Sequence, residues 1–157
     1  MDPNIHIRSF EPGDASAFRE LNERWIVEHF ELERADIEAL SHPYSHYIEP
    51  GGAILMVVDG DSTVGCCALV AAGNGVYEVS KMTIREDYRG KGIGKALLLA
   101  IIDAARNKGA SLVYLVMSDK LQTAVRLYEA VGFRHVPREQ LPPSHYERSN
   151  VFMAMRP

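Results

Sequence analysis

The sequence predicts an α+β domain with a twisted, mixed but largely antiparallel sheet of about seven strands, flanked by about four helices. Apolar and polar residues give strand patterns at 53–58, 64–71 and 76–84, joined by short turns rich in Gly, Asp and Asn, which is typical of an antiparallel meander. A helical pattern then leads into a continuous apolar run at 112–117. Strand, helix and strand in this order form a right-handed parallel crossover, so the sheet should contain both strand directions.

The remaining elements follow from periodicity and from turn residues. A helix should start after Asp14, a plausible N-cap, with Phe18, Leu21 and Trp25 on one buried stripe. Aromatic residues at this spacing usually belong to a core, so we expect Trp25 to be buried. Further strands are expected at 5–10, 133–136 and 150–155, and further helices at 35–40, from about 93 to a cap at Gly109, and at 121–131.

Length and charge limit the function classes. The chain has 157 residues, enough for one core without disulfides or metals, so we expect residues 1–157 to form a single domain. A net charge of −4 without a long basic run argues against nucleic acid as the main partner. No apolar run has membrane-spanning length and the first residues lack a signal peptide pattern, which predicts a cytoplasmic protein without a membrane partner. The six histidines show no zinc-binding spacing, so we expect no metal.

The stretch Arg-Gly-Lys-Gly-Ile-Gly follows the strand pattern at 76–84 and opens the next helix. Its glycines let the backbone approach a ligand closely and leave successive amides free for an anion such as pyrophosphate. It is not a P-loop, because Arg89 and Ala96 stand where that motif needs Gly and Ser or Thr, and it is not the dinucleotide fingerprint, because one residue separates the last two glycines. The expected anion site comprises Arg89, Gly90, Lys91, Gly92, Ile93, Gly94 and Lys95.

The stretch matches the Arg/Gln-x-x-Gly-x-Gly/Ala signature of the GNAT superfamily of acetyl-CoA-dependent N-acetyltransferases. The resemblance extends from Tyr77 to Phe133 and includes a closing Leu-Tyr-Glu-Ala-Val-Gly-Phe similar to the family's second fingerprint. It implies acetyl-CoA as co-substrate and a small-molecule amine as acceptor. It also implies that the strands before and after the crossover part, so that backbone groups of Met82 and Ile84 pair with the amides of pantetheine.

Glu78 is the candidate general base. By period two it should share a strand face with Ser80, Met82 and Ile84, and partial burial would raise its pKa toward useful basicity. The resemblance implies the same role, because relatives often carry Glu at this place. The alternative is a solvated carboxylate at a strand end.

Tyr128 is the candidate acid for the leaving thiolate, as the Tyr of the Leu-Tyr pair in similar proteins implies. The alternative is a core aromatic on the inner stripe of its helix. Many relatives carry Asn shortly before this helix where this chain has Leu121, and Ser118 or Asp119 is the candidate substitute in contacting the cofactor.

The acceptor side of the site is less defined. In the family the first two helices wall it off, and we expect Arg148, with Arg24, to grip a carboxylate on the acceptor amine. A surface Arg148 paired with the adjacent Glu is the alternative.

Two other functions stay open: a non-catalytic acyl-CoA-binding or sensing module, and acetylation of a peptide or protein amine. The sequence leaves the oligomeric state open, a homodimer included.

Overall fold

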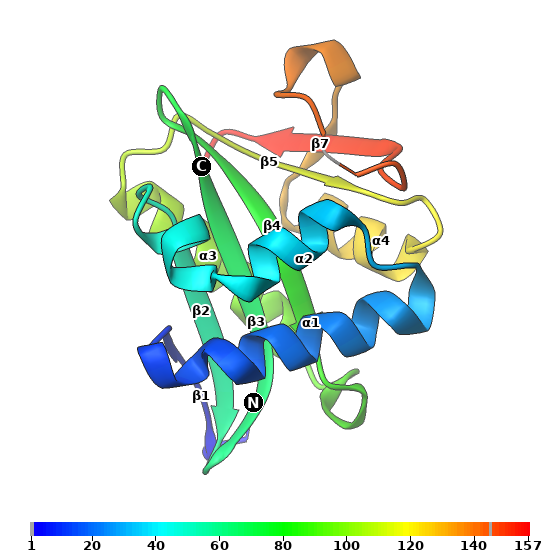
Figure 1. Ribbon diagram of the computed structural model, residues 1–157. Coiled ribbons are helices and arrows are strands. Elements are labelled where there is room, and N and C mark those ends of the chain that lie inside the picture. The colour runs from blue at the N-terminus through cyan, green and yellow to red at the C-terminus, as the bar shows by residue number, and fades with distance from the viewer. Residues whose placement is uncertain (1, 145) are drawn as a thin grey trace.

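The computed structural model describes residues 2–144 and 146–157, and its elements run in the order predicted (Figure 1). His145, one of the six histidines, lies outside the described residues. The strands are β1 (Ile5–Ser9), β2 (Ala53–Asp59), β3 (Ser62–Gly73), β4 (Val76–Ile84), β5 (Leu112–Met117), β6 (Arg134–His135) and β7 (Val151–Met155). The α-helices are α1 (Ala15–His29), α2 (Arg34–Ser41), α3 (Ile93–Asn107) and α4 (Gln122–Val131). A π turn at Tyr44–Ile48 and short 3-10 turns complete the described chain.

All the strands belong to one mixed sheet with the order β1-β2-β3-β4-β5-β7-β6. The strands from β1 to β4 pair antiparallel in sequence order, and the turns predicted this for β2, β3 and β4. The crossover through α3 makes β5 parallel to β4, and β7 then lies antiparallel between β5 and β6. The α+β class and the mixed, largely antiparallel sheet are therefore confirmed.

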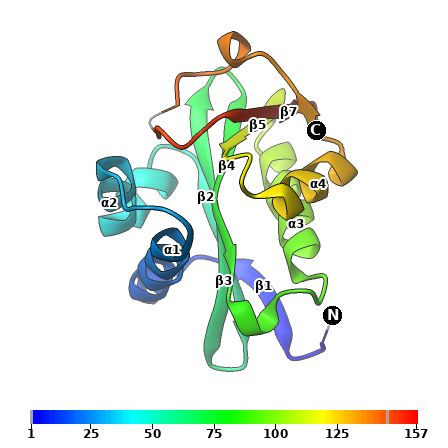
Figure 2. The ribbon, with the colours of Figure 1, turned by 90° about the vertical axis from the view of Figure 1, so that its right-hand side faces the viewer.

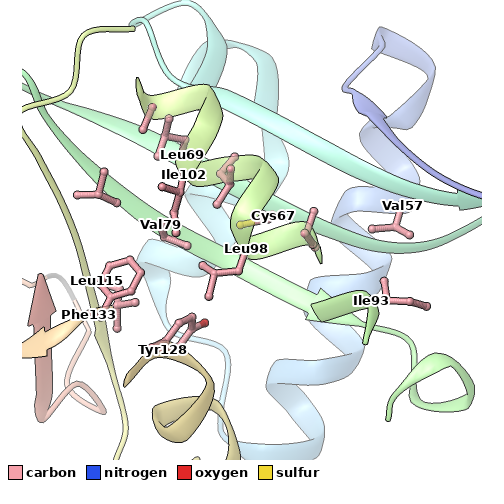
Figure 3. Packing of buried hydrophobic residues seen from close by; sticks show 14 of the residues in the cluster. Val57, Cys67, Leu69, Val79, Ile93, Leu98, Ile102, Leu115, Tyr128 and Phe133 are labelled. Atoms are coloured by element: carbon pink, nitrogen blue, oxygen red, sulfur yellow. The ribbon is translucent and has the colours of Figure 1, made fainter. Parts of the chain in front are cut away.

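Helices cover both faces of the sheet, α1 and α2 on one face and α3 and α4 on the other (Figure 2). Each face has its own apolar cluster. The cluster under α3 and α4 includes Leu98, Ile102, Val79 and Tyr128 (Figure 3), and the cluster under α1 and α2 includes Phe18. Because both faces are packed, side chains of the central strands alternate between two interiors rather than between core and water.

The buried stripe of α1 differs from the predicted one. Phe18, Asn22 and Ile26 are the buried residues of this helix, whereas Trp25 is partly buried and stacks on His29 with 4.8 Å between ring centroids. The predicted stripe followed the aromatic residues and passed over Asn22, because a polar residue does not mark an apolar face. Trp25 still packs against the cluster under α1 and α2, so its assignment to the core holds only in part: it lies at the edge of the core and not on the buried stripe.

Asp14 precedes α1 as predicted, but its side chain does not cap the helix. Its carboxylate instead accepts two hydrogen bonds from the Arg8 guanidinium, at 2.7 and 3.0 Å, and one from the backbone amide of Glu11. The charged partner on β1 holds the carboxylate away from the helix amides. The strand expected at 133–136 is also shorter, covering only Arg134–His135.

Candidate active site

The sheet opens between β4 and β5. The two strands pair over only three residue pairs, from Val76 with Leu112 to Glu78 with Tyr114. Beyond them β4 runs on to Ile84, while β5 pairs along its length with β7. The opening leads into a cavity, called here the central cavity. Residues 79–82 of β4 form one wall of this cavity, and residues 115–118, at the end of β5 and directly after it, form the facing wall. Side chains of α1, α4 and the segment before β7 complete its lining.

A β-bulge lies in β4 at this opening. Ala68 of β3 pairs with Ser80 and Cys66 with Thr83, so that two residues of β4, at positions 81 and 82, stand opposite one residue of β3. Lys81 has φ of 52°, a left-handed conformation that is uncommon for a residue with a side chain.

The bulge shifts the alternation of side chains by one residue. Met82 and Ile84 pack against the α3–α4 cluster together with Val79, whereas Glu78 precedes Val79 and faces the α1–α2 side. The prediction that Glu78, Met82 and Ile84 share one face is therefore wrong. An unbroken period of two does not allow for an inserted residue.

The predicted anion loop lies at the end of β4, before α3. Gly90 and Gly92 have φ of 75° and 81°, and a Cβ atom at either would meet no atom within 4 Å. The amides from residue 90 to residue 95 donate no hydrogen bond to any other described residue. Six consecutive free amides before and at the start of a 15-residue helix are an arrangement that can bind an anion. The side chains of Lys91 and Lys95 are exposed beside it.

The comparisons with known proteins agree with this geometry. A model of the acetyltransferase (GNAT) family matches residues 15–133. The chain belongs to the GNAT acetyltransferase family. It is 32% identical over 142 residues to the mycothiol acetyltransferase of Renibacterium salmoninarum, a match that covers 85% of this chain and 41% of that protein. The chain spans about half the length of the first curated relatives it matches.

Two solved structures show the same GNAT fold. An acetyltransferase of Staphylococcus aureus superposes with a TM-score of 0.89 at 24% identity, covering 97% of this chain and 98% of the other. A putative acetyltransferase of Salmonella typhimurium, solved with its cofactor acetyl-CoA, superposes with a TM-score of 0.76 at 20% identity, covering 98% and 94%. At these identities the likeness concerns the fold.

Glu78 of this GNAT domain is half-buried on the α1–α2 side of the sheet. Burial raises its pKa to about 7, although the nearby positive charge of Lys81 opposes the shift. The solvated carboxylate considered from the sequence would not show such a shift. Glu78 does not itself line the central cavity, whose β4 wall begins at Val79.

Tyr128 lies on α4 and does line the central cavity. Its ring packs edge-to-face on Phe133 (Figure 3), with 5.8 Å between centroids. Its hydroxyl lies 3.8 Å from the sulfur of Met82. Burial raises the pKa of the phenol, so the hydroxyl keeps its proton. Of the two candidates for the missing Asn, Ser118 is buried and lines the cavity, whereas Asp119 is exposed.

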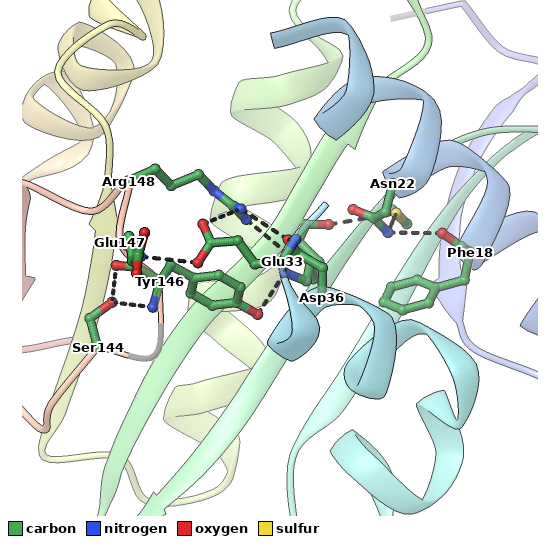
Figure 4. Close-up of polar contacts among 10 residues, drawn as sticks. Phe18, Asn22, Glu33, Asp36, Ser144, Tyr146, Glu147 and Arg148 are labelled. Atoms are coloured by element: carbon green, nitrogen blue, oxygen red, sulfur yellow. Dashed lines mark hydrogen bonds and ion pairs between the residues drawn. The ribbon is translucent and has the colours of Figure 1, made fainter. Parts of the chain in front are cut away.

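Two carboxylates bind Arg148, that of Asp36 on α2 and that of Glu33, the residue before α2 (Figure 4). Its Nη1 and Nη2 donate to the two oxygens of Asp36, at 2.9 and 2.8 Å, and Nη1 also donates to Glu33 at 3.0 Å. The partners are 112 and 115 residues away in sequence, not the adjacent Glu147. The guanidinium also lies over the Tyr146 ring, 4.5 Å from its centroid.

Asp36 joins this arginine to the bulge of β4. Its side chain is fully buried, and the Lys81 ammonium donates to it at 2.7 Å and to the Tyr146 hydroxyl at 2.8 Å. Burial alone would raise the pKa of Asp36, but hydrogen bonds from Arg148 and Lys81 lower it to about 2. Asp36 therefore stays ionised and fixes both cations in the lining of the central cavity.

The two arginines predicted to grip the acceptor lie in different places. Arg148 lines the central cavity, whereas Arg24 is exposed on α1 and lines a separate groove with Arg85 and Arg89. Sequence reasoning missed three residues that shape the site, namely Asn22, Asp36 and Lys81. A charged residue inside an apolar helix pattern was the available signal for Asp36, and a buried Asn at helical spacing from Phe18 was the signal for Asn22.

Among the described residues, no helix combines the length and the apolar character needed to cross a membrane. Likewise, the His, Cys, Asp and Glu side chains of residues 2–144 and 146–157 form no group of three placed to hold a metal ion.

Proposed function

We propose that residues 1–157 form one N-acetyltransferase domain that moves an acetyl group from acetyl-CoA to the amine of a small acceptor. The observation that carries the proposal is the opening between β4 and β5 directly before the loop of free amides. Membership of the GNAT family supports it, as does the acetyl-CoA bound to the structural neighbour from Salmonella typhimurium.

The residues at the opening fit acetyl-CoA. The free amides of residues 90–95 and the dipole of α3 would hold the pyrophosphate, with Arg89, Lys91 and Lys95 adding positive charge. The Nε of Arg89 donates to the Ile84 carbonyl at 2.9 Å, which ties the loop to the end of β4. Backbone groups of β4 beyond Glu78 have no partner on β5, so the edge of β4 at Met82 and Ile84 is open to the pantetheine amides, with the Ile84 carbonyl already bound to Arg89.

The chemistry needs a proton acceptor, a polarised carbonyl and an assisted leaving group. The amine loses a proton to Glu78, whose carboxylate reaches the central cavity through water because it does not line the cavity itself. The nitrogen forms a bond to the acetyl carbon while the backbone amide of Met82 stabilises the oxyanion. The carbon–sulfur bond then breaks, and the Tyr128 hydroxyl donates its proton to the departing thiolate.

For the acceptor, we propose a small amine that also carries a carboxylate, such as an amino acid. Asp36 and Glu33 bind the Nη1–Nη2 edge of Arg148, whereas Nε donates no hydrogen bond within the described chain and Nη2 donates only one, to Asp36, so the Nε–Nη2 edge keeps one N–H on each nitrogen. That edge offers a two-pronged site for a carboxylate. Arg148→Lys keeps the charge and loses the edge, so it should raise the acceptor KM and leave acetyl-CoA affinity unchanged.

Release of CoA thiol tests the proposal. The purified chain is mixed with acetyl-CoA and a panel of amino acids, polyamines, aminoglycosides and peptide N-termini, and thiol is followed over time. We expect release to depend on the amine and to be fastest with an amino acid. Thiol release only with peptide N-termini would instead favour a protein acceptor. Acetyl-CoA binding by calorimetry without thiol release from any amine would favour a non-catalytic binding module.

A further inference from the structure

Asn22 is a buried polar residue on the face of α1 that packs on the sheet. It is 2% exposed and lies between the buried Phe18 and Ile26 of the same stripe. Its Nδ2 donates to the Phe18 carbonyl at 2.8 Å and to the sulfur of Cys66 at 3.4 Å (Figure 4). A carbonyl oxygen only accepts hydrogen bonds, so the nitrogen of the amide must be the atom that faces Phe18. The orientation of the amide is thereby fixed.

The fixed amide leaves its oxygen toward the central cavity, which Asn22 lines. In Figure 4 the oxygen points away from Phe18, toward the side where Tyr146 and Arg148 lie. Within residues 2–144 and 146–157 this oxygen accepts no hydrogen bond. Among the described residues no fully buried side-chain oxygen or nitrogen lacks a partner, so this oxygen is open to the cavity, where water or a ligand can donate a hydrogen bond to it.

We infer that Asn22 Oδ1 binds the acceptor amine by accepting a hydrogen bond from one of its N–H groups. The inference rests on the proposed acetyl transfer. A neutral primary amine has two N–H groups and a lone pair. One N–H bound to Oδ1 leaves the lone pair for the acetyl carbon and the other proton for the path to Glu78. A nitrogen that carries a methyl group in place of the first N–H cannot make this contact, so Asn22 makes the site selective for primary amines.

The test compares primary amines with their N-methyl derivatives. Two pairs are used, alanine with N-methylalanine and benzylamine with N-methylbenzylamine, so that one pair carries a carboxylate and the other does not. In the wild type, kcat/KM should be about tenfold higher for the primary amine, the value of one neutral hydrogen bond. Asn22→Leu should lower kcat/KM for the primary amine by that factor and leave the N-methyl amine within about twofold, so that the ratio falls toward one.

Two controls separate this role from a structural one. Phe18→Leu changes a buried residue one turn earlier that does not line the central cavity, so it should lower stability and keep the primary-to-N-methyl ratio. Asn22→Ala repeats the test without the bulk of leucine, in case that variant does not fold. Acetyl-CoA affinity should be unchanged in every variant.

An unchanged ratio in both Asn22 variants, with thiol release intact in the wild type, would overturn this inference and leave the proposed function standing. Equal rates of the two amines in the wild type would overturn it as well. No thiol release from any amine would instead overturn the proposed function, and this inference with it.

Discussion

The Glu78→Gln substitution tests whether partial burial raises the pKa of this carboxylate. The folded pKa is about 7 and the ordinary value is 4.5, a difference of about 2.5 units that corresponds to about 3 kcal/mol. The folded state binds this proton more tightly than the unfolded state does. The wild type should therefore lose up to about 3 kcal/mol of unfolding free energy as the pH rises from about 4.5 to above 7, and the variant should not.

Urea unfolding at pH 4.5, 6 and 8 measures this difference. The stability of the variant relative to wild type should grow by up to about 3 kcal/mol over that range. Glu20→Gln is the matched control, because Glu20 is exposed on α1 and its replacement should leave the pH dependence of the wild type unchanged. Parallel stability curves for wild type and Glu78→Gln would refute the reasoning and return Glu78 to the class of solvated carboxylates.

The same substitution has a kinetic signature. Only the ionised carboxylate accepts a proton, so wild-type turnover should fall below pH 7, near the pKa of Glu78. Glu78→Gln should abolish this acidic limb and lower turnover by roughly two orders of magnitude, with acetyl-CoA affinity unchanged. A variant with the wild-type pH profile would assign proton transfer to another group.

Three further substitutions have distinct readouts. Tyr128→Phe removes a hydroxyl whose contact within the described chain is a sulfur, so turnover should fall while the Tm stays within a few degrees; equal turnover would exclude leaving-group assistance. Gly92→Leu should weaken acetyl-CoA binding at least about tenfold in calorimetry. The control Gly60→Leu, also at positive φ but in the β2–β3 turn, should lower only stability. Equal acetyl-CoA affinities of the two variants would contradict an anion site at this loop. Asp36→Asn should cost about 3–5 kcal/mol in urea unfolding, because the buried Lys81 loses its carboxylate partner and Arg148 keeps only Glu33; a loss smaller than about 1 kcal/mol would contradict the network.

Local sequence signals predicted the features that depend on neighbouring residues. The turns around Gly60 and Asn74 set the antiparallel meander, and both residues have positive φ in the structure. The glycines of the anion loop predicted free amides at the start of α3, and the structure has them. These features are readable because glycine reports directly on backbone conformation.

Features that depend on distant residues were not readable. Arg148 and Asp36 meet across 112 positions, and no local pattern indicates which carboxylate of the chain an arginine will find. The left-handed conformation of Lys81 also has no local signal, since lysine does not favour it, and the paired strand and the buried Asp36 maintain it. The opening between β4 and β5 came from the family resemblance, not from the residues themselves.

The bulge at Lys81 has a consequence for how such a chain tolerates changes in length. Removing Lys81 would place Met82 opposite Cys67 and leave Met82 and Ile84 on their present face, whereas removing a residue from β4 outside the bulge would turn the side chains on one side of that point to the opposite face. The first change would remove the ammonium that donates to Asp36 and Tyr146, and the second would break either the contact between Met82 and Tyr128 or the packing of Val79. The turn at Gly60 is exposed and joins two strands that pair independently of its length. Insertions and deletions among descendants of this sequence should therefore accumulate at that turn and be absent from β4.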